Sequence, residues 1–303
     1  MGKGFSQVAL IGFGEVGQTL GADLLAAGAS VAAFDIVFAN PSSAPSLALS
    51  KIAVRAAKRA VDAVKDAELV IAAVTAASDL DAAKSAAPHL PPGALYLDVN
   101  SVSPGMKRDC AEIIEAAGGR YVEAAVMTPI APKRIASCML LGGAHVGAFV
   151  EGAAPLGFAG AKAFSRIIGQ ASATKMCRSV IIKGLEALLS ESMLTARYYG
   201  IEKHVLDSLS DLLPVGDWEK LARYFISRTV EHGTRRAEEM RESAKTVAEA
   251  GITPLMALAT AEREDWAAAH KQALAHAHDL GAMLDAIRNT IDTNQNQASK
   301  AAE

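Results

Sequence analysis

Two sets of residues in this 303-residue sequence have types and spacings that suit chemistry. Gly12, Gly14 and Gly17 form a G-x-G-x-x-G pattern directly after the apolar residues 8–11. Glycines at this spacing allow a tight turn, close approach of a pyrophosphate to the backbone, and close packing of a helix on a strand. The second set is centred on Lys175, within a long segment of helical apolar periodicity. The patterns predict dinucleotide binding at residues 12–17 and proton transfer at Lys175.

The predicted dinucleotide site includes an acid at the end of the next apolar run. Asp35 lies about twenty residues after the glycines, where a carboxylate can accept hydrogen bonds from both adenosine ribose hydroxyls. The same charge would repel a 2′-phosphate, so the sequence favours NAD over NADP as cofactor. A solvated aspartate at a strand end is the alternative. Helix-start N–H groups bind phosphate, and the expected cofactor-binding residues are Gly12, Phe13, Gly14, Glu15, Val16, Gly17, Asp35, Thr75 and Asn100.

Lys175 is the candidate acid/base. A lysine that faces a cleft loses hydration, which lowers its pKa and lets it exchange a proton near neutral pH. Arg178 and Ser179 follow at helical spacings and would share its face. Arg178 would either hold a substrate carboxylate or lower the Lys175 pKa further. From the residues alone, a surface lysine that extends its amine into solvent is the alternative.

The elements that position these residues change character along the chain. Up to about residue 168, apolar runs alternate with helical patterns, which predicts an α/β Rossmann domain with a doubly wound parallel sheet. Ligands bind beyond the carboxyl ends of such strands, where Thr75, Asn100, Ser101 and Thr128 fall. The predicted strands are 8–11, 30–35, 51–54, 66–75, 94–99, 120–126 and 137–143, and helices include 55–65, 79–87 and 105–117.

The second predicted domain, residues 169–303, is helical throughout. Its periodicity predicts helices at 171–199, 204–213, 218–250 and 254–291. An all-α domain of this size after a Rossmann domain often mediates dimerisation, so we expect a homodimer formed through it.

Composition limits the remaining functions. The formal net charge of −3 implies no attraction to nucleic acid or to membranes, and no apolar run is long enough to span a bilayer. The odd, sparse set of Cys110, Cys138 and Cys177 indicates reduced thiols in the cytoplasm. We see no signal peptide. The histidines show no metal-ligand spacing, so no metal is expected.

The order of the motifs resembles the β-hydroxyacid dehydrogenases, which include 3-hydroxyisobutyrate dehydrogenase and 6-phosphogluconate dehydrogenase. After the glycine motif come Asp98-x-Asn100-Ser101-x-Ser103-Pro104, the strand-loop at 125–128, and Gly169 followed six residues later by Lys175. The resemblance covers nearly the whole chain. It implies a Rossmann domain, a helical domain, and hydride transfer between nicotinamide and the alcohol carbon of a hydroxy acid, with Lys175 as general acid/base.

The sequence departs from the family where the substrate would be held. The family strand-loop usually ends in Ser-Gly-Gly, whereas Met127, Thr128 and Pro129 stand here, and Pro129 has no N–H to donate. The asparagine common after the family lysine is replaced by Arg178 and Ser179. We therefore expect an anionic small-molecule substrate that is not a simple small 3-hydroxy acid.

A third family motif, Lys-Asp-Leu, is absent near residues 232–240. His232 or Arg236 could replace its lysine, and a solvated or dimer-facing helix surface is the alternative. The candidate substrate-binding residues are Asn100, Ser101, Thr128, Arg178, Ser179, His232 and Arg236.

Two other functions remain open. An imine or keto reductase could use the same scaffold, but those relatives usually replace the lysine, so Lys175 argues against it. A non-catalytic dinucleotide-binding module would explain the altered Ser-Gly-Gly loop.

Overall fold

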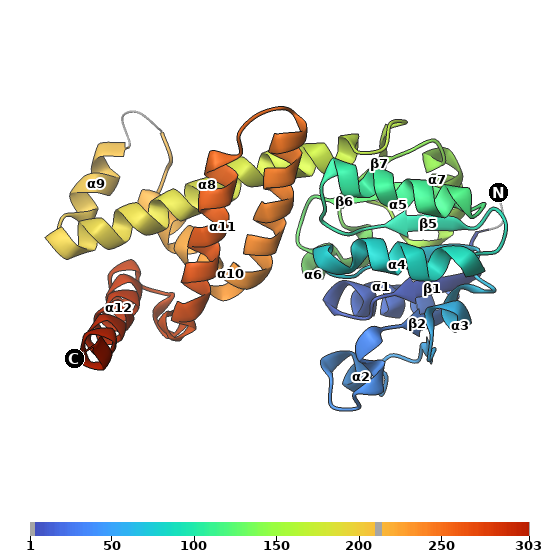
Figure 1. Ribbon diagram of the computed structural model, residues 1–303, viewed down its shortest axis with the longest axis horizontal. Coiled ribbons are helices and arrows are strands. Elements are labelled where there is room, and N and C mark those ends of the chain that lie inside the picture. Colours follow the sequence, from blue (N-terminus) through green and yellow to red (C-terminus); the bar gives the residue numbers. More distant parts are fainter. Residues whose placement is uncertain (1–3, 210–213, 303) are drawn as a thin grey trace. The chain divides into compact units, whose positions relative to one another are not determined.

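The chain divides into two compact units, residues 1–176 and 177–303. A computed structural model describes residues 4–209 and 214–302, with side chains described as far as residue 291. The first unit is a mostly parallel α/β sheet and the second is helical, which confirms the predicted fold class (Figure 1). The division falls within helix α8 (Gln170–Tyr199). The domain boundary expected after residue 168 stays a prediction.

The described residues of the first unit form an eight-stranded sheet in the order β3-β2-β1-β4-β5-β6-β7-β8. Strands β1 to β6 are parallel to one another, whereas β7 runs antiparallel to β6. An antiparallel neighbour needs no crossover of the sheet, and residues 127–138 make this connection. The strands are β1 (Gln7–Ile11), β2 (Ser30–Phe34), β3 (Arg55–Ala56), β4 (Leu69–Ala72), β5 (Leu95–Asp98), β6 (Arg120–Val126), β7 (Met139–Gly142) and β8 (Ala161–Ser165).

Helices cover both faces of this sheet. Val8 and Leu10 of β1 belong to one buried cluster, whereas Ala9 and Ile11 belong to the other. A strand with both faces buried has a continuous apolar sequence, so β1 could be predicted from the sequence. The first cluster includes α1 (Glu15–Ala26), α6 (Ile130–Lys133) and α7 (Val146–Ala153), and the second includes α3 (Ala60–Val64), α4 (Asp79–Ala86) and α5 (Pro104–Ala116).

Some local predictions are wrong. Residues 51–54 form a turn and bend rather than a strand, and the pairing with β2 is made by Arg55–Ala56, where a helix was expected. That helix is limited to α3. Strand β8 was missed because it is an edge strand whose residues are mostly exposed, so it carries no apolar run. The short α2 (Ala44–Ala48) was also missed.

The second unit holds the rest of α8, followed by α9 (Glu202–Leu209), α10 (Trp218–Glu249), α11 (Leu255–Ala267) and α12 (Leu280–Ala302). The single helix expected at 254–291 is wrong, because residues 268–276 form a 3-10 segment in which His270 has non-helical dihedrals (φ −110°, ψ 27°). Residues 210–213 of the helix expected at 204–213 lie outside the described residues. No helix of the described chain is long and apolar enough to cross a membrane.

Candidate functional site

The glycine turn has the geometry that dinucleotide binding requires. Gly12 has φ +94°, and a Cβ placed there would lie 2.3 Å from the carbonyl oxygen of Ala73. A Cβ at Gly17 would lie 2.2 Å from the carbonyl oxygen of Gly12. A Cβ at Gly14 would meet nothing within 4 Å. Gly12 and Gly17 are therefore required by the packing of the turn, whereas the open space at Gly14 leaves the backbone accessible to a pyrophosphate.

Gly14 is also the N-cap of α1, and no side chain caps this helix end. The first N–H groups of a helix have no partners within it, and with the helix dipole they attract an anion. Glu15 is exposed, Val16 packs partly against the core, and Phe13 is fully buried. The start of α1, from Gly14 on, therefore offers backbone N–H groups to a phosphate, and the turn fits a dinucleotide.

Asp35 is tied to this turn. Its Oδ2 accepts a hydrogen bond from the Phe13 N–H at 2.7 Å, and its Oδ1 accepts one from the Val37 N–H at 3.0 Å. The half-buried carboxylate thus lies against the glycine turn at the end of β2. Each oxygen keeps a lone pair for a further donor, as a ribose diol would require.

Asn100 connects the loops that follow β4 and β5. Its Oδ1 accepts a hydrogen bond from the Val74 N–H at 2.7 Å, and its Nδ2 donates to Oδ1 of Asp79 at 2.7 Å. Its backbone N–H donates to Asp98 at 2.9 Å. The exposed Thr75, next to Val74, donates to Ser78 Oγ at 3.2 Å. Asn100 therefore fixes the sheet edge at which Thr75 and Ser101 lie.

Lys175 reaches the same edge of the sheet. Its Nζ donates a hydrogen bond to Oγ of Ser101 at 2.5 Å, and the side chain is half-buried. Both residues belong to the first unit. Gly12 packs closely against the Ala73 carbonyl. The next residue, Val74, is hydrogen-bonded to Asn100. Ser101, which follows Asn100, is hydrogen-bonded to Lys175. The structure thus places the glycine turn, the loops after β4 and β5, and the lysine amine along one edge of the sheet.

The other predicted substrate-binding residues are placed differently. Thr128 is exposed in the loop after β6, followed by Pro129 as N-cap of α6. Arg178 is exposed and Ser179 half-buried, both in the second unit. His232 lies on α10, with Nε2 2.6 Å from an Arg228 nitrogen.

Arg236 is buried within the second unit. It forms an ion pair with Glu186 and another with Glu264, whose Oε1 lies 3.0 Å from Nε. Burial raises the pKa of the Glu264 carboxyl, against the opposing effect of Arg236. This contact set gives Arg236 a structural part within the helical unit, and a substrate-binding role for it stays a prediction.

A buried polar cluster that was not predicted from the sequence lies behind Asn100. Lys107 Nζ lies 2.7 Å from Oδ1 of Asp98, and the Tyr121 hydroxyl donates to Asp98 Oδ2 at 2.6 Å. Burial by itself would lower the pKa of Lys107, but nearby carboxylates, chiefly Asp98 and Asp79, raise it. The signal was available in β5, where an apolar run ends in an acid, Leu-Tyr-Leu-Asp.

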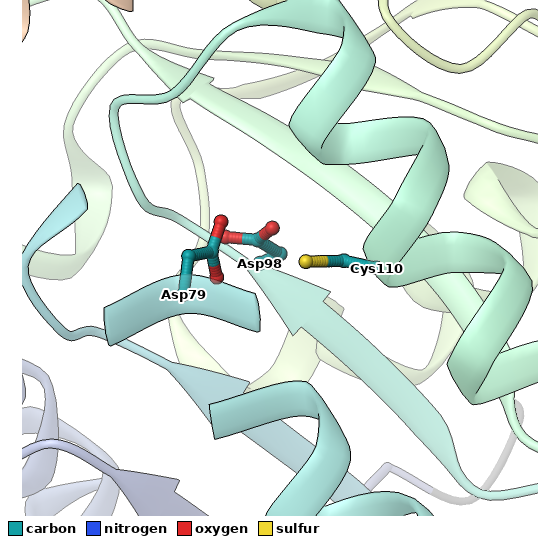
Figure 2. A group of neighbouring side chains, drawn as sticks. All are labelled: Asp79, Asp98 and Cys110. Atoms are coloured by element: carbon teal, nitrogen blue, oxygen red, sulfur yellow. The ribbon is translucent and has the colours of Figure 1, made fainter. Parts of the chain in front are cut away.

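This cluster contains a group that could suggest a metal site. Donor atoms of Asp79, Asp98 and Cys110 lie within 4.8 Å of one another, and Figure 2 shows the sulfur directed toward the two carboxylates. Burial and the charge of Asp98 raise the pKa of Asp79 well above its usual range, and burial also raises the pKa of the Cys110 thiol. The Lys107 ammonium already supplies the positive charge. A thiol whose pKa is raised, beside a lysine ammonium, does not suit a metal ion, so the set is a structural network.

Comparison with known proteins identifies the family. A model of the NAD binding domain of 6-phosphogluconate dehydrogenase matches residues 7–164, more than half of the chain. The chain therefore belongs to this family of NAD(P)-binding proteins, which confirms the resemblance to the β-hydroxyacid dehydrogenases. A model described as a domain of unknown function, DUF1932, matches residues 196–266 in the helical unit.

Several relatives are similar over nearly their whole length. A conserved hypothetical protein from Sinorhizobium meliloti 1021 is 34% identical, with a TM-score of 0.75, covering 92% of this chain and 95% of that one. An uncharacterized 28.5 kDa protein of Methanothermus fervidus is 29% identical over 82% of this chain and 94% of its own. The 3-hydroxyisobutyrate dehydrogenase of Mycobacterium tuberculosis is 20% identical, with a TM-score of 0.66, covering 93% and 98%. That last likeness shows the shared fold alone.

Proposed function

We propose that this protein is an NAD-dependent dehydrogenase that oxidises the alcohol carbon of an anionic hydroxy acid, reversibly. The observation that carries the proposal is the hydrogen bond between Lys175 Nζ and Ser101 Oγ at the sheet edge that begins with the glycine turn. A lysine amine on the same sheet edge as a dinucleotide turn suits removal of a hydroxyl proton. The family match supports the cofactor class.

In this proposal each group has a separate task. The neutral amine of Lys175 takes the proton from the substrate hydroxyl, and returns it to the carbonyl oxygen in the reverse direction. Ser101 orients the amine through the hydrogen bond that it accepts. The nicotinamide, when bound, supplies the acceptor for the hydride that leaves the alcohol carbon. Thr128 offers a hydroxyl to the substrate, while Arg178 holds its anionic group or lowers the pKa of Lys175.

NAD is the proposed cofactor, in preference to NADP. The Asp35 carboxylate lies against the glycine turn, with a free lone pair on each oxygen. Ribose hydroxyls can donate to these lone pairs, whereas a 2′-phosphate would meet a like charge.

The proposed assembly is a cytoplasmic homodimer formed through the helical domain. Within the second unit, α8 exposes Ile181, Leu185 and Leu188, and α11 exposes Leu255 and Met256. Apolar patches of this kind mark interaction surfaces. The three cysteines are free thiols in the described structure, which agrees with a reducing compartment.

A substrate panel tests the function. Purified protein with NAD is offered aliphatic hydroxy acids and aryl alcohols, and reduction of the nicotinamide is followed by its absorbance. Oxidation of one hydroxy acid, with lower turnover when NADP replaces NAD, supports the proposal. Amine-dependent oxidation of NADH without alcohol activity would instead indicate an imine reductase. Binding of NAD in a calorimeter without turnover on any substrate would indicate a non-catalytic module.

A further inference from the structure

A buried acid on β6 meets the start of the helix that carries Lys175. Glu123 is fully buried, and its Oε1 accepts hydrogen bonds from the N–H groups of Gly169 at 2.7 Å and Ala171 at 3.2 Å. Its Oε2 accepts a third from Ser172 at 3.3 Å. All four residues belong to the first unit. One carboxylate thus satisfies three of the N–H groups that a helix start leaves without partners.

The surrounding backbone leaves room for this carboxylate. Gly142 of β7 is the cross-strand partner of Glu123, and a Cβ placed there would lie 2.2 Å from Oε1. Gly169 has φ +99°, a left-handed conformation that glycine adopts without strain. Ser172 Oγ donates to the Gly169 carbonyl at 3.1 Å and closes the first turn. The two glycines therefore shape the space and the backbone that this contact requires.

The Glu123 carboxylate has favourable electrostatic partners at this position. A carboxylate at a helix N-terminus interacts favourably with the helix dipole. The charge of Glu123 is also among those that raise the pKa of Lys107 on α5, so a buried cation lies close enough to interact with it. A buried carboxylate without such partners would be costly. The contact between β6 and α8 is consequently a charged one, and loss of the charge should loosen the helix start.

We propose that Glu123 is a positioning residue for Lys175, because it fixes the first turn of α8 and so holds the lysine amine at Ser101. Lys175 follows Ser172 by three residues, less than one helical turn. A change in the helix start would therefore rotate or shift the amine relative to the loop after β5. This inference rests on the proposed function for the role of Lys175, but the position of the amine can be tested without turnover.

The test compares Glu123→Gln with the wild type. Glutamine has nearly the size of glutamate but carries no charge. Its NH₂ group replaces one of the two oxygens that accept hydrogen bonds from the backbone N–H groups of the helix start. We expect amide hydrogen exchange of the peptide 169–176 to accelerate about tenfold or more, since this segment opens locally. Acetylation of Lys175, followed by mass spectrometry, should accelerate about fivefold, the factor expected when one hydrogen bond is lost. The kcat for hydroxy-acid oxidation should fall about 10- to 100-fold, with an unchanged KM for NAD, because misplacement of a reacting group lowers turnover.

Two variants serve as controls. Glu112→Gln removes an exposed acid from α5 and should leave all three readouts unchanged. Tyr121→Phe, on the same strand as Glu123, removes the hydrogen bond to Asp98 and should lower stability without accelerating exchange at 169–176.

The outcomes separate this inference from the proposed function. Unchanged exchange at 169–176, or unchanged acetylation of Lys175, in the Glu123→Gln variant would overturn the positioning role, whatever turnover is measured. Faster exchange and faster acetylation with wild-type kcat would support the positioning role and would count instead against Lys175 as the acid/base of the proposed function. If the wild-type protein oxidises no hydroxy acid, the proposed function fails, and the exchange and acetylation results still decide whether Glu123 holds Lys175.

Discussion

Lys175 Nζ and Ser101 Oγ are 2.5 Å apart although the residues are 74 positions apart in the sequence. This hydrogen bond joins the start of α8 to the loop after β5. It places an amine at the carboxyl edge of a parallel sheet, where ligands of such sheets bind. The hydrogen bond therefore locates the proposed chemistry on the same sheet edge as the turn that fits a dinucleotide.

Gly14 and Gly17 should differ in what their substitution costs. Gly14→Ala should leave stability almost unchanged, because the added Cβ meets nothing within 4 Å, but should weaken NAD binding about tenfold or more by blocking the pyrophosphate approach. Gly17→Ala should lower the free energy of unfolding by about 1–3 kcal/mol, because its Cβ meets the Gly12 carbonyl oxygen. Urea unfolding and calorimetric titration with NAD measure both effects. Equal losses of stability in the two variants would contradict this division of roles.

Asp35→Asn should weaken NAD binding and reduce the preference over NADP. The amide has one oxygen, so it cannot accept from both the Phe13 and Val37 N–H groups as the carboxylate does. We expect the Kd for NAD to rise about tenfold, or about 1.4 kcal/mol, and the Kd for NADP to rise less or to fall. The exposed Asp66→Asn is a charge-matched control with unchanged binding. A ratio of NADP to NAD affinity equal to that of the wild type would argue against the role of Asp35.

Asp79 should make the fold less stable as the pH rises. Burial and Asp98 raise its pKa in the folded state above the unfolded value of about 3.9, so the folded protein binds the proton more tightly. Its contribution to stability is therefore lost as the pH rises from about 4 through the folded-state pKa. Asp79→Asn cannot ionise and keeps the oxygen that accepts from Asn100.

The free energy of unfolding of this variant should consequently fall less steeply with pH, and exceed the wild-type value above the folded-state pKa. Urea denaturation over a pH series measures this. The exposed Asp81→Asn, on the same helix, should follow the wild type. Parallel curves for Asp79→Asn and the wild type would show that Asp79 is ionised in the folded protein.

Arg236→Ala should destabilise the helical unit strongly. It would leave the buried Glu186 and Glu264 without their cation, and removal of one partner from a buried ion pair costs about 3–5 kcal/mol. The neighbouring Arg235→Ala removes an exposed partner of Glu239 and should cost about 1 kcal/mol or less. Thermal unfolding of the two variants tests this difference. Similar midpoints would mean that Arg236 is free for another role.

The parts of the fold that could be predicted from the sequence are the strands that carry apolar runs. Strands buried on both faces, such as β1 and β5, carry apolar runs, and their order with helices fixes the sheet edge where the candidate site lies. The antiparallel direction of β7 could not be predicted, because an apolar run has no direction. The edge strand β8 carries too little apolar sequence to be recognised.

The parts of the candidate site that could not be predicted are hydrogen bonds between residues far apart in the sequence. Both ends of the Asn100 amide bind protein groups, one of them Asp79, 21 residues earlier, and the ligand contacts expected of Asn100 stay a prediction. The role of Glu123 depends on a helix start 46 residues later. For Glu123 the available signal was a single acid within an apolar strand, although this signal does not name the partner.

The most direct test of the account is hydride transfer by Lys175→Ala, with the best substrate from the panel and NAD at saturating concentration. Removal of a positioned acid/base should lower kcat by about 10²- to 10⁴-fold, while calorimetry shows wild-type affinity for NAD and urea unfolding shows an intact fold. Turnover near the wild-type rate in a folded, NAD-binding Lys175→Ala variant would contradict the claim that this amine transfers the proton.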